Sequence, residues 1–159
     1  MWRSSTEAFM RGDRLIIASG ATRLCLDASD IIGIVEVERL TLMPGQSGIV
    51  AGVITLRGSA VAVVDITKAF DGMGPASIKD GPRKVVVVGD KTRVLGLSIG
   101  GAVISFLWEE GSAGISATDE RTLFSSGAVK TGIDSMRIID WRGLFEETAR
   151  ILSAEGSGV

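Results

Sequence analysis

The sequence predicts a mainly β protein made of two small β-barrel halves, followed by a C-terminal helix. Its 21 glycines and only 3 prolines favour many tight turns between strands. Short apolar runs alternate with turn signals, and a turn-rich linker near residues 71–83 separates two such series. Two hairpin-rich series fit two small antiparallel barrels better than one large sandwich. We therefore treat the 159 residues as a single domain with two subdomains.

The first series contains five expected strands and two short helical turns. Residues 19–20 and 57–59 are turn signals between apolar runs. Asp27 and Asp65 are favourable N-cap residues, so we expect a helical turn after each, the second ending at Phe70. The expected strands are residues 14–19, 22–26, 35–40, 49–56 and 60–64, with a loop at residues 42–47.

The second series repeats the pattern and ends in a helix. Gly100-Gly101 is a strong two-residue hairpin signal, and Asp134-Ser135 is the expected turn of a final hairpin. After Asp140, a plausible N-cap, apolar residues recur at helical spacing, which predicts an amphipathic helix over residues 141–154. The expected strands are residues 84–88, 92–99, 102–108, 128–133 and 136–139, with a loop at residues 109–116.

An internal echo links the two series. Asp65 is followed five positions later by Phe70, and Asp140 is followed at the same offset by Phe145. In each case an apolar strand runs into an aspartate cap, and a helix folds a phenylalanine back toward the strands. Because this local pattern is common, duplication and chance similarity explain it about equally well.

Composition excludes several classes of chemistry. The chain has no histidine and one cysteine, which rules out a histidine-dependent triad, a histidine metal site and a thiolate cluster. A formal net charge of −2 offers little attraction for nucleic acid or an anionic membrane. Residues 1–14 do not resemble a secretory signal, and the longest uncharged stretch, residues 40–56, is interrupted by Pro44. We expect a cytoplasmic protein without membrane insertion, cofactor or metal.

Other candidate sites have simpler structural explanations. Glu36 and Glu38 share one strand face, but nothing else converges there, so a solvated face is preferred over acid–base chemistry. Acidic residues at 109–110 and 119–120 match no calcium-ligand spacing, and the glycines at 96, 100 and 101 match no phosphate-binding motif. Cys25 lies in an apolar strand, which favours core packing over a nucleophilic role.

Arg57 is the candidate with the least obvious structural explanation. It follows an apolar strand and precedes Gly58 at a turn, where a guanidinium group can pair with a carboxylate or bind backbone carbonyls. A structural clamp and a partner contact are equally consistent with this position. The strands are apolar on both faces, and this surface is divided between packing of the two barrels and a candidate binding groove in a proportion that the sequence alone does not determine.

The residues around Arg57 resemble the CheW-like family of bacterial chemotaxis coupling proteins. Residues 52–70, GVITLRGSAVAVVDITKAF, are similar to the family pattern G-V-x-N-L-R-G-x-x-x-P-V-V-D-L-x-x-x-F. Residues 24–27, 94–99 and 136–145 resemble other strands and the closing helix, so the similarity covers roughly residues 12–152. Four positions depart from the pattern: Gly33 replaces a common Glu, Thr55 an Asn, Ala62 a Pro and Gly100 an Asp.

The resemblance implies two intertwined, five-stranded SH3-like barrels with a groove between them and no catalytic activity. It implies a signal-transduction adaptor that joins the cytoplasmic tip of chemoreceptors to the regulatory domain of the histidine kinase CheA, at receptor arrays and without a small-molecule substrate. The receptor groove would involve Ile31, Val53, Thr55, Leu56, Arg57 and Gly58. The kinase-facing surface would involve Gly96, Ile99, Gly100, Gly101 and Ala102.

Two other functions stay open on the sequence alone. The first is an adaptor of the same fold that serves a motility, surface-sensing or developmental array. The second is an unrelated small β-barrel enzyme or ligand-binding domain, which an enclosed pocket with converging carboxylates would favour.

Overall fold

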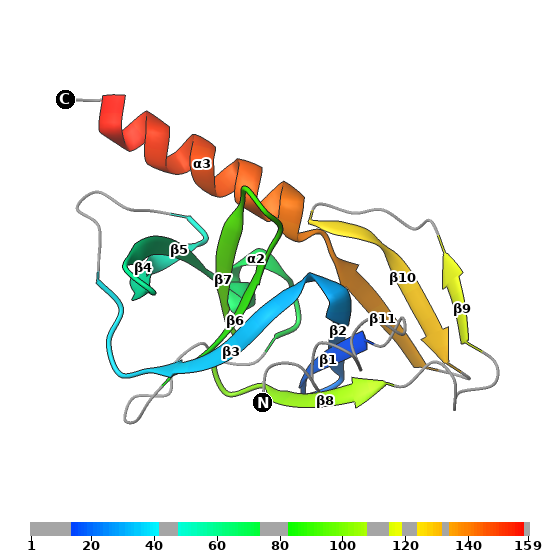
Figure 1. The fold of residues 1–159 in the computed structure, drawn as a ribbon. Coiled ribbons are helices and arrows are strands. Elements are labelled where there is room, and N and C mark those ends of the chain that lie inside the picture. Colours follow the sequence, from blue (N-terminus) through cyan, green and yellow to red (C-terminus); the bar gives the residue numbers. More distant parts are fainter. Residues whose placement is uncertain are drawn as a thin grey trace.

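The strands form two sheets that exchange segments of the sequence (Figure 1). The computed structural model describes residues 14–41, 48–73, 83–107, 115–118, 124–131 and 134–157. The strands are β1 (Arg14–Ser19), β2 (Thr22–Asp27), β3 (Ile31–Val37), β4 (Val50–Leu56), β5 (Ser59–Asp65), β6 (Arg83–Gly89), β7 (Val94–Ser98), β8 (Val103–Leu107), β9 (Ile115–Thr118), β10 (Ser125–Thr131) and β11 (Asp134–Ile139). The helices are the 3-10 turn η1 (Ala28–Asp30), α2 (Ile66–Ala69) and α3 (Trp141–Ser157).

The first two strands belong to one sheet, β3 to β7 form the other, and β8 to β11 return to the first sheet. The six-stranded sheet has the order β8-β1-β2-β11-β10-β9, and the five-stranded sheet has the order β3-β6-β7-β5-β4. Two pairings are parallel: β5 lies beside β7, and β11 lies beside β2 from the opposite end of the sequence. This arrangement confirms a mainly β, intertwined fold with a C-terminal helix. The first sheet has one strand more than expected, because residues 115–118 form β9 at its edge.

The five-stranded sheet curls until its two edges meet at one point. Beyond β3, Thr41 pairs with Val53 of β4 through two backbone hydrogen bonds of 3.0 and 2.9 Å. A Cβ atom on the neighbouring Gly52 would lie 2.8 Å from the Thr41 carbonyl oxygen, so only glycine permits this approach. The result is a partly open barrel rather than a flat sheet.

Most expected elements are confirmed, with shifted boundaries. Strand β3 begins at Ile31 and ends at Val37, four and three residues earlier than predicted. The predicted turn at residues 134–135 is wrong. Both residues belong to β11, in which Asp134 pairs with Thr131 of β10. Helix α3 extends to Ser157, beyond the predicted end at residue 154. The predicted loop at residues 42–47 and residues 109–114 of the predicted loop at 109–116 lie outside the described residues. The prediction is wrong for residues 115–116, which belong to β9.

The predicted hairpin at Gly100-Gly101 is also wrong. Strand β7 lies in the five-stranded sheet, whereas β8 pairs with β1 in the six-stranded sheet. The glycines do allow a sharp change of direction, since Gly100 has a φ of +59°. Turn chemistry does not determine the next neighbour, and β8 places Ile104 beside the buried Ile17 of β1.

Three apolar clusters explain why the strands are so uniformly apolar. The largest cluster combines residues of both sheets with α2 and α3, whereas a second belongs to the five-stranded sheet alone. Along β6, Val86 and Val88 enter the first cluster and Val85 and Val87 enter the second. Both faces of this strand are therefore buried, which accounts for its continuous valine run. A third, small cluster centres on Cys25 in the six-stranded sheet.

The proposed linker between subdomains lies mostly outside the described residues, which stop at residue 73 and resume at residue 83. The strands on either side of it, β5 and β6, belong to the same sheet. The division of the chain into two subdomains at this segment stays a prediction.

Candidate functional site

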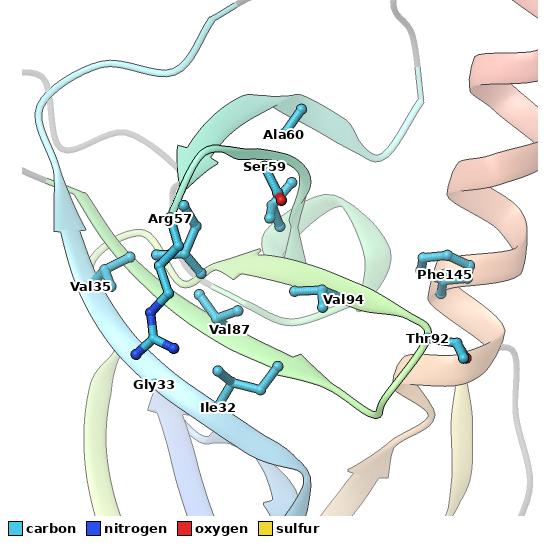
Figure 2. Close-up of a pocket in the computed structure, with 12 residues that line it drawn as sticks. Ile32, Gly33, Val35, Arg57, Ser59, Ala60, Val87, Thr92, Val94 and Phe145 are labelled. Carbon is cyan, nitrogen blue, oxygen red and sulfur yellow. The ribbon is translucent and has the colours of Figure 1, made fainter. Parts of the chain in front are cut away.

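A groove of about 500 Å³ opens on the five-stranded sheet (Figure 2). Its walls come from β3, the β4–β5 turn, the β6–β7 hairpin and one residue of α3. Most of the lining is aliphatic, and Arg57 is the only charged residue among the described residues that line it. The lining residues are Ile32, Gly33, Val35, Leu56, Arg57, Ser59, Ala60, Val61, Val87, Thr92, Val94 and Phe145.

Arg57 reaches the groove from a two-residue turn. Strand β4 ends at Leu56 and β5 begins at Ser59, so Arg57 and Gly58 form the whole loop. Their φ angles are +50° and +81°, and a type I′ turn requires positive φ at both positions. Figure 2 shows the Arg57 side chain extending from this turn toward β3, with its guanidinium group near Gly33. The turn therefore places a cation at the rim of an apolar groove.

The six predicted receptor residues occupy different environments. Leu56 and Arg57 line the groove. Val53 and Thr55 alternate with the buried Ile54 and so lie on the other face of β4, where Thr55 is exposed. Ile31 is buried in the largest core cluster, and Gly58 is exposed at the turn. Direct contact by each of these residues with a receptor stays a prediction.

The predicted kinase-facing residues surround the connection from β7 to β8. Gly96 and Ile99 are buried, and a Cβ atom on Gly96 would lie 2.9 Å from the Val85 side chain. These two residues support the packing of β7 and present no side-chain surface to a partner. Gly100 is also buried, whereas Gly101 is exposed and Ala102 is half-buried.

Sequence reasoning missed three parts of the groove. Gly33 was considered only as a departure from a family pattern, yet it lines the groove next to the turn. Thr92 lies in the β6–β7 turn and Val94 begins β7, two residues later than the predicted start of this strand at residue 92, and nothing in the sequence shows that these side chains face the groove. The repeated offset between aspartate and phenylalanine pointed to Phe145, which is the contribution of α3 to the wall.

Charged and aromatic side chains brace the wall formed by the β6–β7 hairpin and α3. Two guanidinium groups contact the ring of the buried Trp141, with Arg93 5.4 Å and Arg142 4.6 Å from its centroid. Arg93 also pairs with Asp90 at 2.9 Å and with Glu146 at 3.7 Å. Arg93 lies between the lining residues Thr92 and Val94, and Glu146 follows the lining residue Phe145. The contacts of Arg93 with Trp141 and Glu146 therefore fix the β6–β7 hairpin relative to α3.

Two carboxyl groups near this wall have shifted pKa values. Hydrogen bonds from the Thr92 backbone N–H and from Arg93 hold the pKa of Asp90 well below its usual range. Burial raises the pKa of Asp30, although Arg142 lies 3.9 Å away and acts in the opposite direction.

The other sequence candidates do not form a chemical site. Cys25 is fully buried, and burial raises the pKa of its thiol to about 11, so the thiolate needed for nucleophilic attack is scarce. Glu36 and Glu38 are exposed on β3 and beyond it. The acidic residues at 109–110 and 119–120 lie outside the described residues. Across the described part of the chain, no three metal-ligating side chains gather, and no helix is long and apolar enough to span a membrane.

Comparisons with known proteins agree with this architecture. The crystal structure of the scaffolding protein TtCheW from Thermoanaerobacter tengcongensis superposes with a TM-score of 0.63 at 23% sequence identity, covering 82% of this chain and 89% of that one. A search of curated proteins gives no match. The family model of the CheW-like domain matches residues 14–149, which is most of the sequence. The chain therefore belongs to the CheW-like domain family, a family of scaffold and coupling proteins.

Proposed function

We propose that this chain is a non-enzymatic adaptor that couples chemoreceptors to the histidine kinase CheA. The observation that carries the proposal is the apolar groove at the Leu56-Arg57-Gly58 turn. This turn lies in the segment with the most specific similarity to the CheW-like family pattern, residues 52–70. The described residues lining the groove include no carboxylate, so the groove does not favour the alternative of a small β-barrel enzyme.

The receptor side of the proposal rests on the shape and chemistry of the groove. Its aliphatic walls suit the apolar face of a helix, as in other complexes in which a helix occupies a groove. Ala60 and Arg57 are exposed at this surface, so an incoming helix can reach them without unfolding the barrel. A groove of this size supports a modest interface, which suits a contact that must respond to receptor state.

The kinase side of the proposal uses a different part of the chain. We place the contact with the regulatory domain of CheA at the β7–β8 connection, where Gly101 is exposed and Ala102 is half-buried. Val103, at the start of the edge strand β8, is 67% exposed and extends this surface with an apolar side chain. One barrel of the kinase domain would pack here while the groove remains available to the receptor.

Co-purification with a chemoreceptor signalling tip and with the CheA regulatory domain tests the proposal. Ala60→Tyr places a bulky side chain at an exposed position in the groove, and we expect it to abolish receptor binding while kinase binding is retained. Ala21→Tyr is the matched control, because Ala21 is an exposed alanine at the β1–β2 turn of the other sheet. Binding of neither partner by the unmodified chain would refute the proposal. Binding only to receptors of a motility or developmental array would reassign the adaptor to that array.

A further inference from the structure

We infer that Arg57 selects the occupant of the groove by charge, binding a carboxylate that the partner helix carries within its apolar face. The inference rests on the proposed function of the groove and goes one step further, by stating which helix the groove accepts. Three features support it: the conformation of Arg57, the composition of the groove and the absence of a side chain at Gly33.

The backbone of Arg57 adopts a conformation that arginine disfavours. With φ at +50°, Arg57 is in the left-handed region, which glycine, asparagine and aspartate adopt far more readily than long side chains. Hairpin turns of this kind are formed most stably by Asn-Gly or Asp-Gly. Arginine at this position therefore does not serve the turn, and its side chain is the part that contributes to function.

The composition of the groove determines what that side chain can recognise. Arg57 provides the only charge among the described lining residues, and aliphatic side chains surround it. A guanidinium group has five N–H donors in a planar fork that matches a carboxylate with two parallel hydrogen bonds. Arg57 already interacts within its own chain, so a partner carboxylate would add to that interaction or exchange with it. A seated helix would exclude water from the groove and strengthen such a pair.

Gly33 provides the space that a carboxylate requires. Figure 2 places the Arg57 guanidinium near Gly33 on β3, where a glycine has no side chain to fill the groove. An aspartate or glutamate from the partner can enter beside the guanidinium, while apolar residues of the same helix face contact Val35 and Val94. The occupant is therefore an amphipathic helix with one acidic residue inside its apolar stripe, rather than a purely apolar helix.

The first test removes the charge without disturbing the turn. Arg57→Asn introduces the residue that this turn favours, so we expect the variant to be at least as stable as the unmodified chain. Its affinity for a chemoreceptor signalling tip should fall about tenfold, in line with loss of a charge-assisted pair. Its binding should also become less sensitive to salt. Arg57→Lys keeps the charge but loses the planar fork of donors, so its affinity for the tip should lie between those of the unmodified chain and Arg57→Asn.

A charge swap then identifies the partner carboxylate. Each acidic residue of the receptor tip is changed to arginine and titrated against Arg57→Glu; one combination should recover most of the lost affinity. If Arg57→Asn binds as tightly as the unmodified chain, with the same salt dependence, and Ala60→Tyr still abolishes binding, the charge inference is overturned and the groove remains the receptor site. If the unmodified chain does not bind the tip at all, both the inference and the proposed function fail.

Discussion

Two corners of this molecule start from the same local sequence and reach different structures. In the first, β5 runs into Asp65 and the four-residue α2; in the second, β11 runs into Asp140 and the 17-residue α3. Both aspartates act as caps, since Asp65 accepts a hydrogen bond from the Thr67 N–H at 3.0 Å and Asp140 accepts one from the Gly143 N–H at 3.1 Å. Both strands lie parallel to a strand that is not their neighbour in the sequence, β7 for β5 and β2 for β11.

The two phenylalanines that follow at the same offset have different surroundings. Phe70 is 3% exposed and lies under the Arg137 guanidinium, 5.3 Å from the ring centroid. The chain beyond it is fixed to the six-stranded sheet, where Arg137 donates a hydrogen bond to the Asp71 carbonyl and Thr22 donates one to the Gly72 carbonyl. Phe145 is half-buried in the groove wall, on a helix that continues past it to Ser157.

The comparison separates local from tertiary determinants. An aspartate after an apolar strand starts a helix in both corners, because its side chain satisfies a free backbone N–H. Whether the phenylalanine becomes core or binding surface depends on what the neighbouring sheet places over it. Four predictions can break or sharpen this distinction, beginning with the largest expected effect.

Phe70→Ala should lower the free energy of unfolding by about 3–5 kcal/mol, because it leaves a cavity in the core. Phe145→Ala should cost only about 1 kcal/mol, since that ring is half-buried, but it should weaken binding of a receptor tip. Urea denaturation of both variants measures the first quantity, and titration with the tip measures the second. Equal losses of stability would show that the two corners are energetically the same and would refute the comparison.

Removal of the caps should have smaller and unequal effects. Asp65→Ala should cost about 1–2 kcal/mol and Asp140→Ala about 1 kcal/mol. The loss of stability should be larger at Asp65, because its carboxylate also accepts a hydrogen bond of 2.6 Å from the Thr67 hydroxyl. Asp65→Asn and Asp140→Asn are the matched controls, since asparagine also caps helices. The assignment of these residues as caps would fail if alanine and asparagine variants had the same unfolding midpoints in urea.

The polar surroundings of α3 should give this corner a dependence on pH. The raised pKa of Asp30 means that the folded chain favours the protonated carboxyl. The contribution of Asp30 to the free energy of unfolding is therefore fully present below the pKa that this group has in the unfolded chain, and it is lost as the pH rises through the pKa that it has in the folded chain. Asp30→Asn mimics the protonated form, and its stability relative to the unmodified chain should increase over this acidic interval and then stay level. Urea unfolding of both chains between pH 3 and 7 measures the difference. A relative stability that decreases with pH would mean that Arg142 outweighs burial.

The smallest effect is expected at Gly143, in the first turn of α3. A Cβ atom there would lie 2.6 Å from an Asp140 carboxylate oxygen, which can move at the expense of the cap. Gly143→Ala gains up to about 1 kcal/mol of helix propensity and loses about as much capping, so its net effect should be near zero. In an Asp140→Ala background the clash is absent, and the same substitution should stabilise by about 1 kcal/mol. If the two backgrounds give the same value, Gly143 and Asp140 are not coupled.

Local signals in the sequence determined most of the elements of this fold. Short apolar runs located the strands, aspartate caps located the starts of α2 and α3, and Arg57-Gly58 located the β4–β5 turn, because each signal acts within a few residues. The family pattern around Arg57 pointed to the groove region for the same reason.

Only the tertiary structure decided which strands pair and which residues meet. Gly100-Gly101 has the chemistry of a hairpin, yet β8 leaves β7 and pairs with β1, where Ile104 packs against the largest core cluster. The groove likewise joins Gly33, Arg57 and Phe145, which are far apart in the sequence. Burial is not directional and can be satisfied by any apolar neighbour, so the sequence pattern shows that a surface will be covered, but not by which part of the chain.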